Sequence, residues 1–286
     1  MKDPISLEER KKIQLEMLIE IDVFCRINKI RYILAFGTLL GAIRHKGYIP
    51  WDDDVDISMP YEDLLRFKRD FKSEKLKYCD IDTEKNYDFP FSRVCYLPTY
   101  SRCGLICKSY GISIDVYPLI EVSNSNEIIS KQLKTAKILF SRRCFIKRIR
   151  GSVIRHLPVK TIPFYKQINT VYRNYLFNEM RKVGGGRFFF VAGLLELFDK
   201  HVLDFNPFDE LIEVDFENHK FFGPARYDEY LSTRYGDYMQ LPPEDQRHPY
   251  HGGYTPACRQ TARPGPPMSA GCFPAGDAEC LPLPLW

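Results

Sequence analysis

The 286-residue sequence has no long apolar run, no signal-like leader and no regular cysteine spacing. No stretch approaches the roughly 20 apolar residues that a helix needs to cross a bilayer. The N-terminus, MKDPISLEERKKIQLEMLIEI, is charged and amphipathic and lacks a secretory h-region. The nine cysteines are irregularly placed, so we expect most of them to be reduced thiols. These absences argue against a membrane-spanning protein or a disulfide scaffold and favour the cytoplasm.

Acidic residues are almost missing from one block of the chain. Between Lys131 and Lys182 there are fourteen Lys or Arg residues and a single acid, Glu179. Such a block attracts phosphates, and it fits a solvated helix face, a peripheral contact with an anionic membrane, or nucleic acid. Interleaved aromatic and aliphatic residues suit an interfacial helix, for example at the inner face of a membrane. No nucleic-acid-binding motif accompanies the block, so we expect no nucleic-acid partner.

The overall composition is that of a soluble globular protein, with 44% hydrophobic and 27% charged residues. We expect one domain over residues 1–251, with a basic helical subregion over 131–186. Residues 252–286 contain seven prolines and five glycines and show no apolar periodicity. This tail is expected to be disordered or loosely attached, and one interpretation is a non-native ending such as the product of a frameshift.

Hydrophobic spacing predicts a long helix over residues 6–28, opened by a Ser6–Glu9 capping box. Two buried strands are expected at residues 54–59 and 111–120. The other elements are expected in this order: a short strand at 30–36, a helical turn at 38–44, helices at 61–71, 127–150 and 165–182, strand-like segments within 208–223, and a helix at 227–235 followed by Gly236.

The segment WDDDVDI at residues 51–57 concentrates like charges, which is unfavourable unless a cation or an exposed turn compensates. Because side chains alternate along a strand, Asp54 and Asp56 share one face, and Asp52 joins them if the extended path begins that early. Carboxylates gathered on one face suit Mg²⁺ or Mn²⁺. An exposed acidic turn is the alternative. A calcium loop is disfavoured because Ile57 occupies the required glycine position.

A second acid stands alone in the apolar segment GISIDVYPLI, at Asp115. A lone carboxylate in a buried strand is costly unless it meets a cation or hydrogen-bond donors. Placing Asp115 beside Asp54 and Asp56, around one metal ion, accounts for both features. The alternative is a strand-end carboxylate that caps a nearby turn.

Upstream of the aspartates, Gly37 and Thr38 stand between a predicted strand and a predicted helix. A glycine at such a turn lets backbone N–H groups approach a phosphate closely. A strand, a Gly-Thr turn, a helix and then a D-x-D strand form the layout of a nucleotidyltransferase-type site. In such a site the turn holds nucleotide phosphates and the aspartates hold their metal.

Three segments carry a resemblance to a known family: FGTLLGAIRHKGYIPWDDDVDI, GISIDVYPL and YGDYMQLPPEDQRHPYH. Together they resemble the LicD-type phosphotransferases, which are related to the fukutin-type sugar-phosphate transferases, over roughly residues 10–251. The resemblance implies an α+β fold, with a nucleotidyltransferase-like mixed β-sheet core flanked by helices and a helical basic insertion. It also implies transfer of a phosphorylated alcohol, phosphocholine being the leading candidate, from a CDP-linked donor, with release of CMP. The acceptor would be a hydroxyl of a cell-surface glycan or its lipid-linked precursor, as in lipopolysaccharide, capsule or teichoic acid.

The same resemblance assigns roles to individual residues. Asp52, Asp54 and Asp56 are expected to bind Mg²⁺ or Mn²⁺ against the donor pyrophosphate. Asp115 is expected to be a further metal ligand or the base that takes the acceptor proton, so Asp54, Asp56 and Asp115 form the expected catalytic set. The residues expected to bind the donor are Gly37, Thr38, Gly41, Arg44, His45, Arg247 and His248.

Other functions remain open on the sequence. The same turn and aspartates could serve nucleotidyl transfer from an NTP, and a non-catalytic glycan- or membrane-binding module is the alternative from another class. Four further residues invite a zinc site: Cys79, Cys95, Cys103 and Cys107. Their wide, irregular spacing is unlike paired C-x-x-C hooks, so free thiols are the preferred interpretation.

Overall fold

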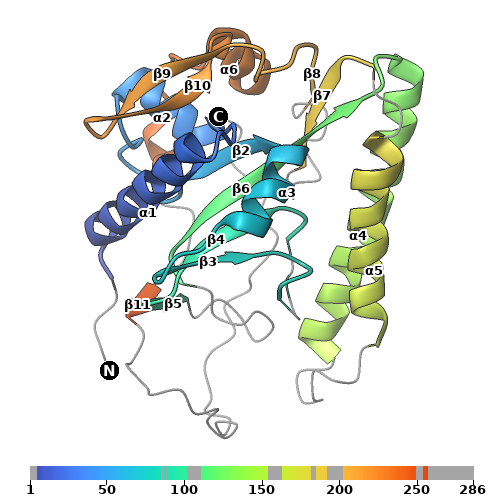
Figure 1. Ribbon diagram of the computed structural model, residues 1–286. Helices are drawn as coiled ribbons and strands as arrows, with labels where there is room; N and C mark the ends of the chain where they lie inside the picture. Colours follow the sequence, from blue (N-terminus) through green and yellow to red (C-terminus); the bar gives the residue numbers. More distant parts are fainter. Residues whose placement is uncertain are drawn as a thin grey trace, which may run out of the picture.

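A computed structural model describes residues 5–84, 87, 89–101, 111–153, 163–181, 185–191, 202–248 and 254–256. Its centre is a mixed β-sheet with the strand order β1-β2-β6-β4-β3, extended by β7 on β6 and by β8 on β7 (Figure 1). The strands are β1 Ile33–Leu34, β2 Asp56–Pro60, β3 Leu76–Cys79, β4 Ser92–Tyr96, β6 Ser113–Val122, β7 Arg187–Phe190 and β8 Val202–Leu203. The sheet and its helices confirm the predicted α+β class.

Helices surround this sheet, and a pair of them lies to one side (Figure 1). The helices are α1 Leu7–Ile27, α2 Phe36–His45, α3 Tyr61–Asp70, α4 Asn126–Val153, α5 Pro163–Asn174 with a π-helical turn at Tyr175–Met180, and α6 Tyr227–Tyr235. A 3₁₀ turn follows at Glu244–Gln246. Within the described residues, no helix combines the length and the hydropathy that a bilayer span requires.

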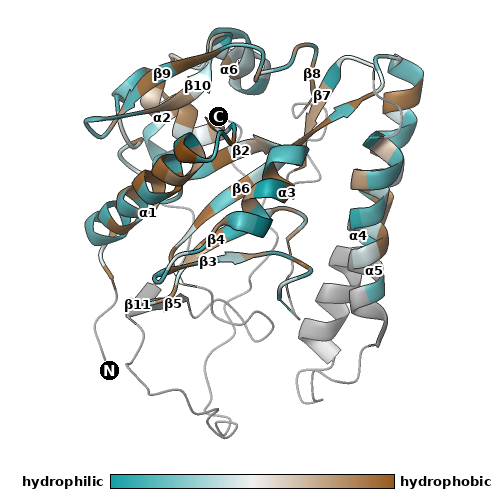
Figure 2. Cartoon of the chain, in the orientation of Figure 1, coloured by the Kyte–Doolittle hydropathy of each residue, from teal (hydrophilic) through white to brown (hydrophobic). Residues whose placement is uncertain are grey.

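The long N-terminal helix forms as predicted. The Ser6 hydroxyl accepts a hydrogen bond from the Glu9 amide at 3.1 Å, which caps the first turn of α1. Met17, Leu18 and Ile21 lie on its buried face and pack into the main core. Figure 2 shows hydrophobic and hydrophilic colours side by side along α1, as expected for a helix with one buried face.

Two hydrophobic clusters hold the molecule together. The larger one joins α1, the sheet, α2, α3 and α6, with Ile57 and Val116 fully buried at its centre. The second joins β6 and β7 to α4 and α5 through residues such as Val122, Leu133 and Leu176. The exposed Lys131 and Lys134 lie on α4, in the predicted basic block. Residues 154–162 and 182 of that block lie outside the described residues, and its membrane contact stays a prediction.

A separate hairpin is formed by β9, Leu211–Phe216, and β10, His219–Pro224. Its two-residue turn, Glu217–Asn218, has positive φ at both positions, 51° and 62°, as a type I′ turn requires. The Glu217 amide donates to the Lys46 carbonyl at 3.0 Å. The Glu217 side chain accepts from the Tyr48 amide at 3.0 Å. The hairpin tip therefore clamps the loop that leads into the aspartates.

The structure corrects three local predictions. The strand expected over 30–36 shrinks to Ile33–Leu34, because the chain turns at Phe36, whose φ is +46°, and continues directly as α2. The helix expected over 165–182 begins earlier, at Pro163, and widens into a π-helical turn. The tail is not wholly without structure, because β11, Tyr254–Pro256, pairs with β5, Thr99–Ser101. Residues 252–253 and 257–286 lie outside the described residues.

Candidate active site

The parallel pairing of β2 and β6 brings the two acidic segments together. Asp56 lies directly opposite Asp115 in the register, and the Asp115 amide donates to the Val55 carbonyl at 3.0 Å. Opposed residues on neighbouring strands present their side chains to the same face of a sheet. The predicted juxtaposition of Asp115 with the D-x-D segment is therefore present. β2 itself begins only at Asp56, so the three preceding aspartates lie in the segment that enters the strand.

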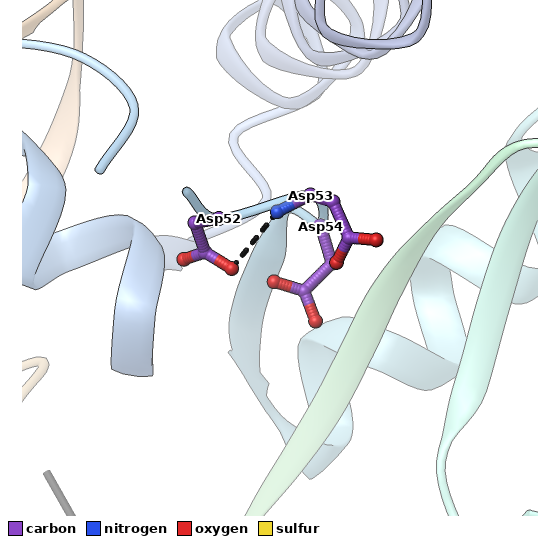
Figure 3. A group of neighbouring side chains, drawn as sticks. All are labelled: Asp52, Asp53 and Asp54. Atoms are coloured by element: carbon purple, nitrogen blue, oxygen red, sulfur yellow. Dashed lines mark hydrogen bonds between the residues drawn. The ribbon is translucent and has the colours of Figure 1, made fainter. Parts of the chain in front are cut away.

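Asp52, Asp53 and Asp54 lie close together in that entering segment (Figure 3). One carboxylate oxygen of each lies within 4.8 Å of the other two, and the Asp53 amide donates to Asp52 Oδ1 at 3.0 Å. Asp53 differs from its neighbours because Arg10 Nη1 on α1 donates to its Oδ2 at 2.7 Å in a buried ion pair. We therefore assign Asp53 to anchoring the segment on α1, in spite of its closeness to the other two carboxylates.

Electrostatic strain is concentrated on Asp52 and Asp56. Burial raises the pKa of Asp52 well above its usual value, and the charge of Asp54 raises it further. Burial likewise raises the pKa of Asp56, with added repulsion from Asp54, Asp115 and Asp52. In addition, Asp56 Oδ1 is buried and has no hydrogen-bond partner within the described residues. An unpartnered carboxylate oxygen among like charges is the position that a divalent cation would satisfy.

Arg93 on β4 compensates part of this charge. It lies opposite Asp115 in the antiparallel β4–β6 register. Its Nε lies 2.7 Å from Asp115 Oδ1, and its Nη2 donates to Oδ2 at 2.9 Å. The guanidinium also lies 3.8 Å from the centre of the Phe89 ring. Sequence reasoning missed Arg93, for which the only signal is a single arginine inside the otherwise uncharged strand SRVCY.

A second buried arginine, Arg234 on α6, was also missed. Its guanidinium lies 4.7 Å from the centre of the Phe36 ring, and its charge lowers the pKa of Asp56 against the repulsion of the other carboxylates. Arg234 directly precedes the third motif that carried the family resemblance, which begins at Tyr235. The carboxylates thus lie near fixed positive charges from two distant parts of the chain.

The expected phosphate turn at the start of α2 is packed tightly against the acidic segment. A Cβ added at Gly37 would lie 2.9 Å from Asp52 Oδ2, and one added at Gly41 would lie 2.5 Å from the Gly47 carbonyl oxygen. The Thr38 hydroxyl accepts from the Asp56 amide at 2.8 Å. Gly37 and Thr38 therefore pack α2 against the aspartates, and Gly41 lets α2 approach the loop at Gly47. Their contact with the donor stays a prediction.

Arg44, His45 and Arg247 gather around Trp51. Arg44 Nε donates to His45 Nε2 at 3.0 Å, and the His45 and Trp51 rings are 6.4 Å apart. The Arg247 guanidinium lies 5.5 Å from the centre of the Trp51 ring. Burial lowers the pKa of Arg44, and the nearby charge of Arg247 lowers it further, so the two cations repel each other. His248 is exposed at the end of this segment.

Two cysteines of the proposed zinc set can be placed. Cys79 and Cys95 are buried free thiols on β3 and β4, packed with Tyr87 in a small cluster. Cys103 and Cys107 lie outside the described residues. No disulfide joins Cys79 and Cys95, and the preference for free thiols over a zinc site stays a prediction.

Comparisons with known proteins agree with this architecture. Residues 29–132, which include every site carboxylate and Arg93, match the family described as LicD/FKTN/FKRP, nucleotidyltransferase domain. The chain is 28% identical over 263 residues to the lipopolysaccharide cholinephosphotransferase LicD of Haemophilus influenzae, covering 86% of this chain and 96% of that protein. An uncharacterized protein of Rickettsia typhi is 41% identical over 64 residues, 22% of this chain and 21% of its own length. One of Rickettsia prowazekii is 33% identical over 87 residues, 30% of this chain and 26% of its own. By these comparisons, residues 29–132 carry a LicD/FKTN/FKRP nucleotidyltransferase domain, and the chain is similar to a LicD protein over most of its length.

Proposed function

We propose that this protein is a metal-dependent phosphotransferase that moves phosphocholine from a CDP-linked donor to a hydroxyl of a cell-surface glycan, such as lipopolysaccharide, and releases CMP. The observation that carries the proposal is the buried, unpartnered Asp56 oxygen inside a cluster of four carboxylates. The similarity to a lipopolysaccharide cholinephosphotransferase over most of the chain supports the choice of donor alcohol and acceptor.

Asp52, Asp54 and Asp56 are the residues that would hold Mg²⁺ or Mn²⁺. Their ligand atoms are carboxylate oxygens, which hard divalent cations prefer. When bound, the ion supplies positive charge against the donor pyrophosphate and the phosphorus under attack. The mutual repulsion that raises the pKa of Asp52 and Asp56 is relieved by the same charge.

Asp115 serves this site best as a fixed charge. The acceptor hydroxyl must lose a proton as its oxygen attacks phosphorus, and a general base needs an oxygen within hydrogen-bond reach of that proton. Both Asp115 oxygens are already engaged by Arg93, at 2.7 and 2.9 Å. Proton uptake there would require one of these charge-assisted contacts to open. We therefore assign Asp115 to orienting the acidic face and not to proton transfer.

Arg44 and Arg247 are suited to the phosphates of the donor. Within the described residues Arg44 forms no ion pair with a carboxylate, and Arg247 lies 3.9 Å from the exposed Glu244. Two cations that repel each other bind a shared anion favourably, because the anion relieves their repulsion.

The test is a thermal-shift series with CDP-choline, CDP-ribitol, CDP-glycerol and ATP, each with and without Mn²⁺. We expect stabilisation by CDP-choline that requires Mn²⁺ and is lost in Asp54→Asn, together with CMP release when a glycan acceptor is added. Stabilisation by ATP alone would instead support nucleotidyl transfer. A folded protein that no nucleotide stabilises would refute a donor site.

A further inference from the structure

Helix α1 contacts the loop that carries the aspartates at three points. Lys11 Nζ donates to the Ile49 carbonyl at 3.1 Å, ahead of the aspartates. Arg10 Nη1 donates to the Asp53 carboxylate at 2.7 Å. Gln14, one turn further along α1, donates through Nε2 to the Asp53 carbonyl at 3.3 Å. The helix therefore fixes the path of this loop on its way into β2.

Gln14 also reaches the neighbouring strand. The same Nε2 donates to the Ser113 carbonyl at 3.3 Å. Ser113 is the first residue of β6 and lies two residues before Asp115. The Gln14 side chain is fully buried between these partners. Its amide therefore joins the two segments from which the site carboxylates come.

The position of this bridge coincides with the place where the strand pairing stops. The pairing of β2 with β6 begins with Asp56 opposite Asp115, and the Asp115 amide donates to the Val55 carbonyl just ahead of it, at 3.0 Å. The segment with the other three aspartates precedes β2 and is not part of this pairing. Gln14 takes the place of a ladder bond there, because the two protons on its Nε2 can each meet one carbonyl.

Fold stability alone explains this glutamine poorly. Its Oε1 is buried and has no hydrogen-bond partner in the part of the chain that the structure describes, and a buried unpaired polar atom is unfavourable. Its two hydrogen bonds, at 3.3 Å, are longer than the roughly 2.7–3.2 Å that is usual for N–H···O contacts. The benefit that remains is geometric, because the bridge fixes the separation of the two acidic segments.

We propose that Gln14 is a positioning residue for the metal site, which keeps Asp52 and Asp54 within reach of the ion that Asp56 would bind. The inference rests on the proposed function, because it takes a divalent cation at these carboxylates as given. Loss of a side chain that orients metal ligands typically weakens metal binding about 10–100-fold. Gln14 acts through the backbone of the ligand segment, so we expect an effect at the lower end, about tenfold.

Calorimetric titration with Mn²⁺ alone, together with urea unfolding of each metal-free variant, tests the assignment. Gln14→Met removes both donated hydrogen bonds at similar side-chain volume, and it should bind Mn²⁺ about tenfold more weakly. Gln14→Asn keeps the amide but is one methylene shorter, so it cannot span both carbonyls and should also weaken Mn²⁺ binding.

Gln132→Met is the matched control. Gln132 on α4 donates through its own Nε2 to the Met180 carbonyl at 3.5 Å, and Met180 belongs to the second hydrophobic cluster. This variant should lower the urea midpoint and keep the Mn²⁺ affinity of the unmodified protein, because its hydrogen bond does not touch the acidic segments.

Two results would overturn the positioning role and leave the proposed function standing. The first is an unchanged Mn²⁺ affinity in Gln14→Met, or in Gln14→Asn if the methionine variant does not fold. The second is an equal loss of affinity in Gln132→Met, which would trace the effect to a general loss of stability. A folded, unmodified protein that does not bind Mn²⁺ would overturn the metal-dependent function and this inference together.

Discussion

Replacing Arg93 with methionine should destabilise the metal-free protein by about 3–5 kcal/mol, the cost of breaking a buried ion pair from one side. The Arg93 and Asp115 side chains are only 17% and 11% exposed, and two contacts join them. Methionine keeps much of the apolar stem against Phe89 but leaves the Asp115 carboxylate without its cation. That carboxylate would then stand opposite Asp56, in a cluster that already carries strong repulsion.

The magnitude depends on burial, and a second pair in the same chain supplies the comparison. Arg226 and Glu229 form an ion pair in which both side chains are 54% exposed. Exposed pairs contribute about 0–1 kcal/mol, because water screens the charges. Arg226→Met should therefore lose much less stability than Arg93→Met. Arg93→Lys should fall between the two, since it keeps the charge and loses the planar, two-point contact.

Equilibrium urea unfolding of the four proteins, first with EDTA and then with excess Mn²⁺, measures these differences. Mn²⁺ should recover more stability in Arg93→Met than in the unmodified protein, because the released carboxylate becomes available to the cation. A loss in Arg93→Met no larger than that in Arg226→Met would refute the reasoning that Arg93 compensates a buried charge at this site.

Two further predictions follow from the site. Burial and neighbouring charges raise the pKa of Asp52 and Asp56 in the folded protein. The folded protein therefore keeps protons that the unfolded chain releases near pH 4. The free energy of unfolding of the metal-free protein should consequently fall as the pH rises from about 4 through the raised pKa values. Melting temperatures between pH 4 and pH 8 with EDTA should show this fall, Mn²⁺ should abolish it above neutrality, and a flat profile with EDTA would contradict it. Gly41→Ala should cost about 1–3 kcal/mol by overpacking, since the new Cβ would lie 2.5 Å from a backbone carbonyl oxygen. Urea unfolding measures the loss of stability. An unchanged midpoint would contradict the prediction, because it would show that the loop at Gly47 moves aside without cost.

Local chemistry made part of the site predictable. The alternation of Asp54 and Asp56 with apolar neighbours pointed to one acidic face, and the isolation of Asp115 pointed to its meeting that face. The register of β2 and β6 agrees with the second inference, since it places Asp56 opposite Asp115. Asp54 lies before the strand, which begins only at Asp56. The helix over 227–235 and its end at Gly236 were also predicted from spacing alone.

The compensating arginines could not be predicted in the same way. Arg93 acts through its position opposite Asp115, and that position is set by the pairing of strands 22 residues apart in sequence. Arg234 reaches the carboxylates from α6, far along the chain. A single charged residue leaves no periodic signal, so only the tertiary arrangement assigns its partner. We expected Gly37 to lie at the end of a strand. The chain turns one residue earlier, at Phe36, and the positive φ of Phe36 is a strained backbone conformation that composition does not reveal.

The clamp formed by the β9–β10 turn makes the matched domain dependent on the rest of the chain. Residues 29–132 carry every site carboxylate, yet the loop before them is held by Glu217 at 3.0 Å from the Tyr48 amide. Glu217 is itself held in the left-handed region, at a local cost of about 1–3 kcal/mol that its two contacts with the loop offset. A fragment ending at residue 132 would keep all the proposed metal ligands and lose a contact that positions the loop before them.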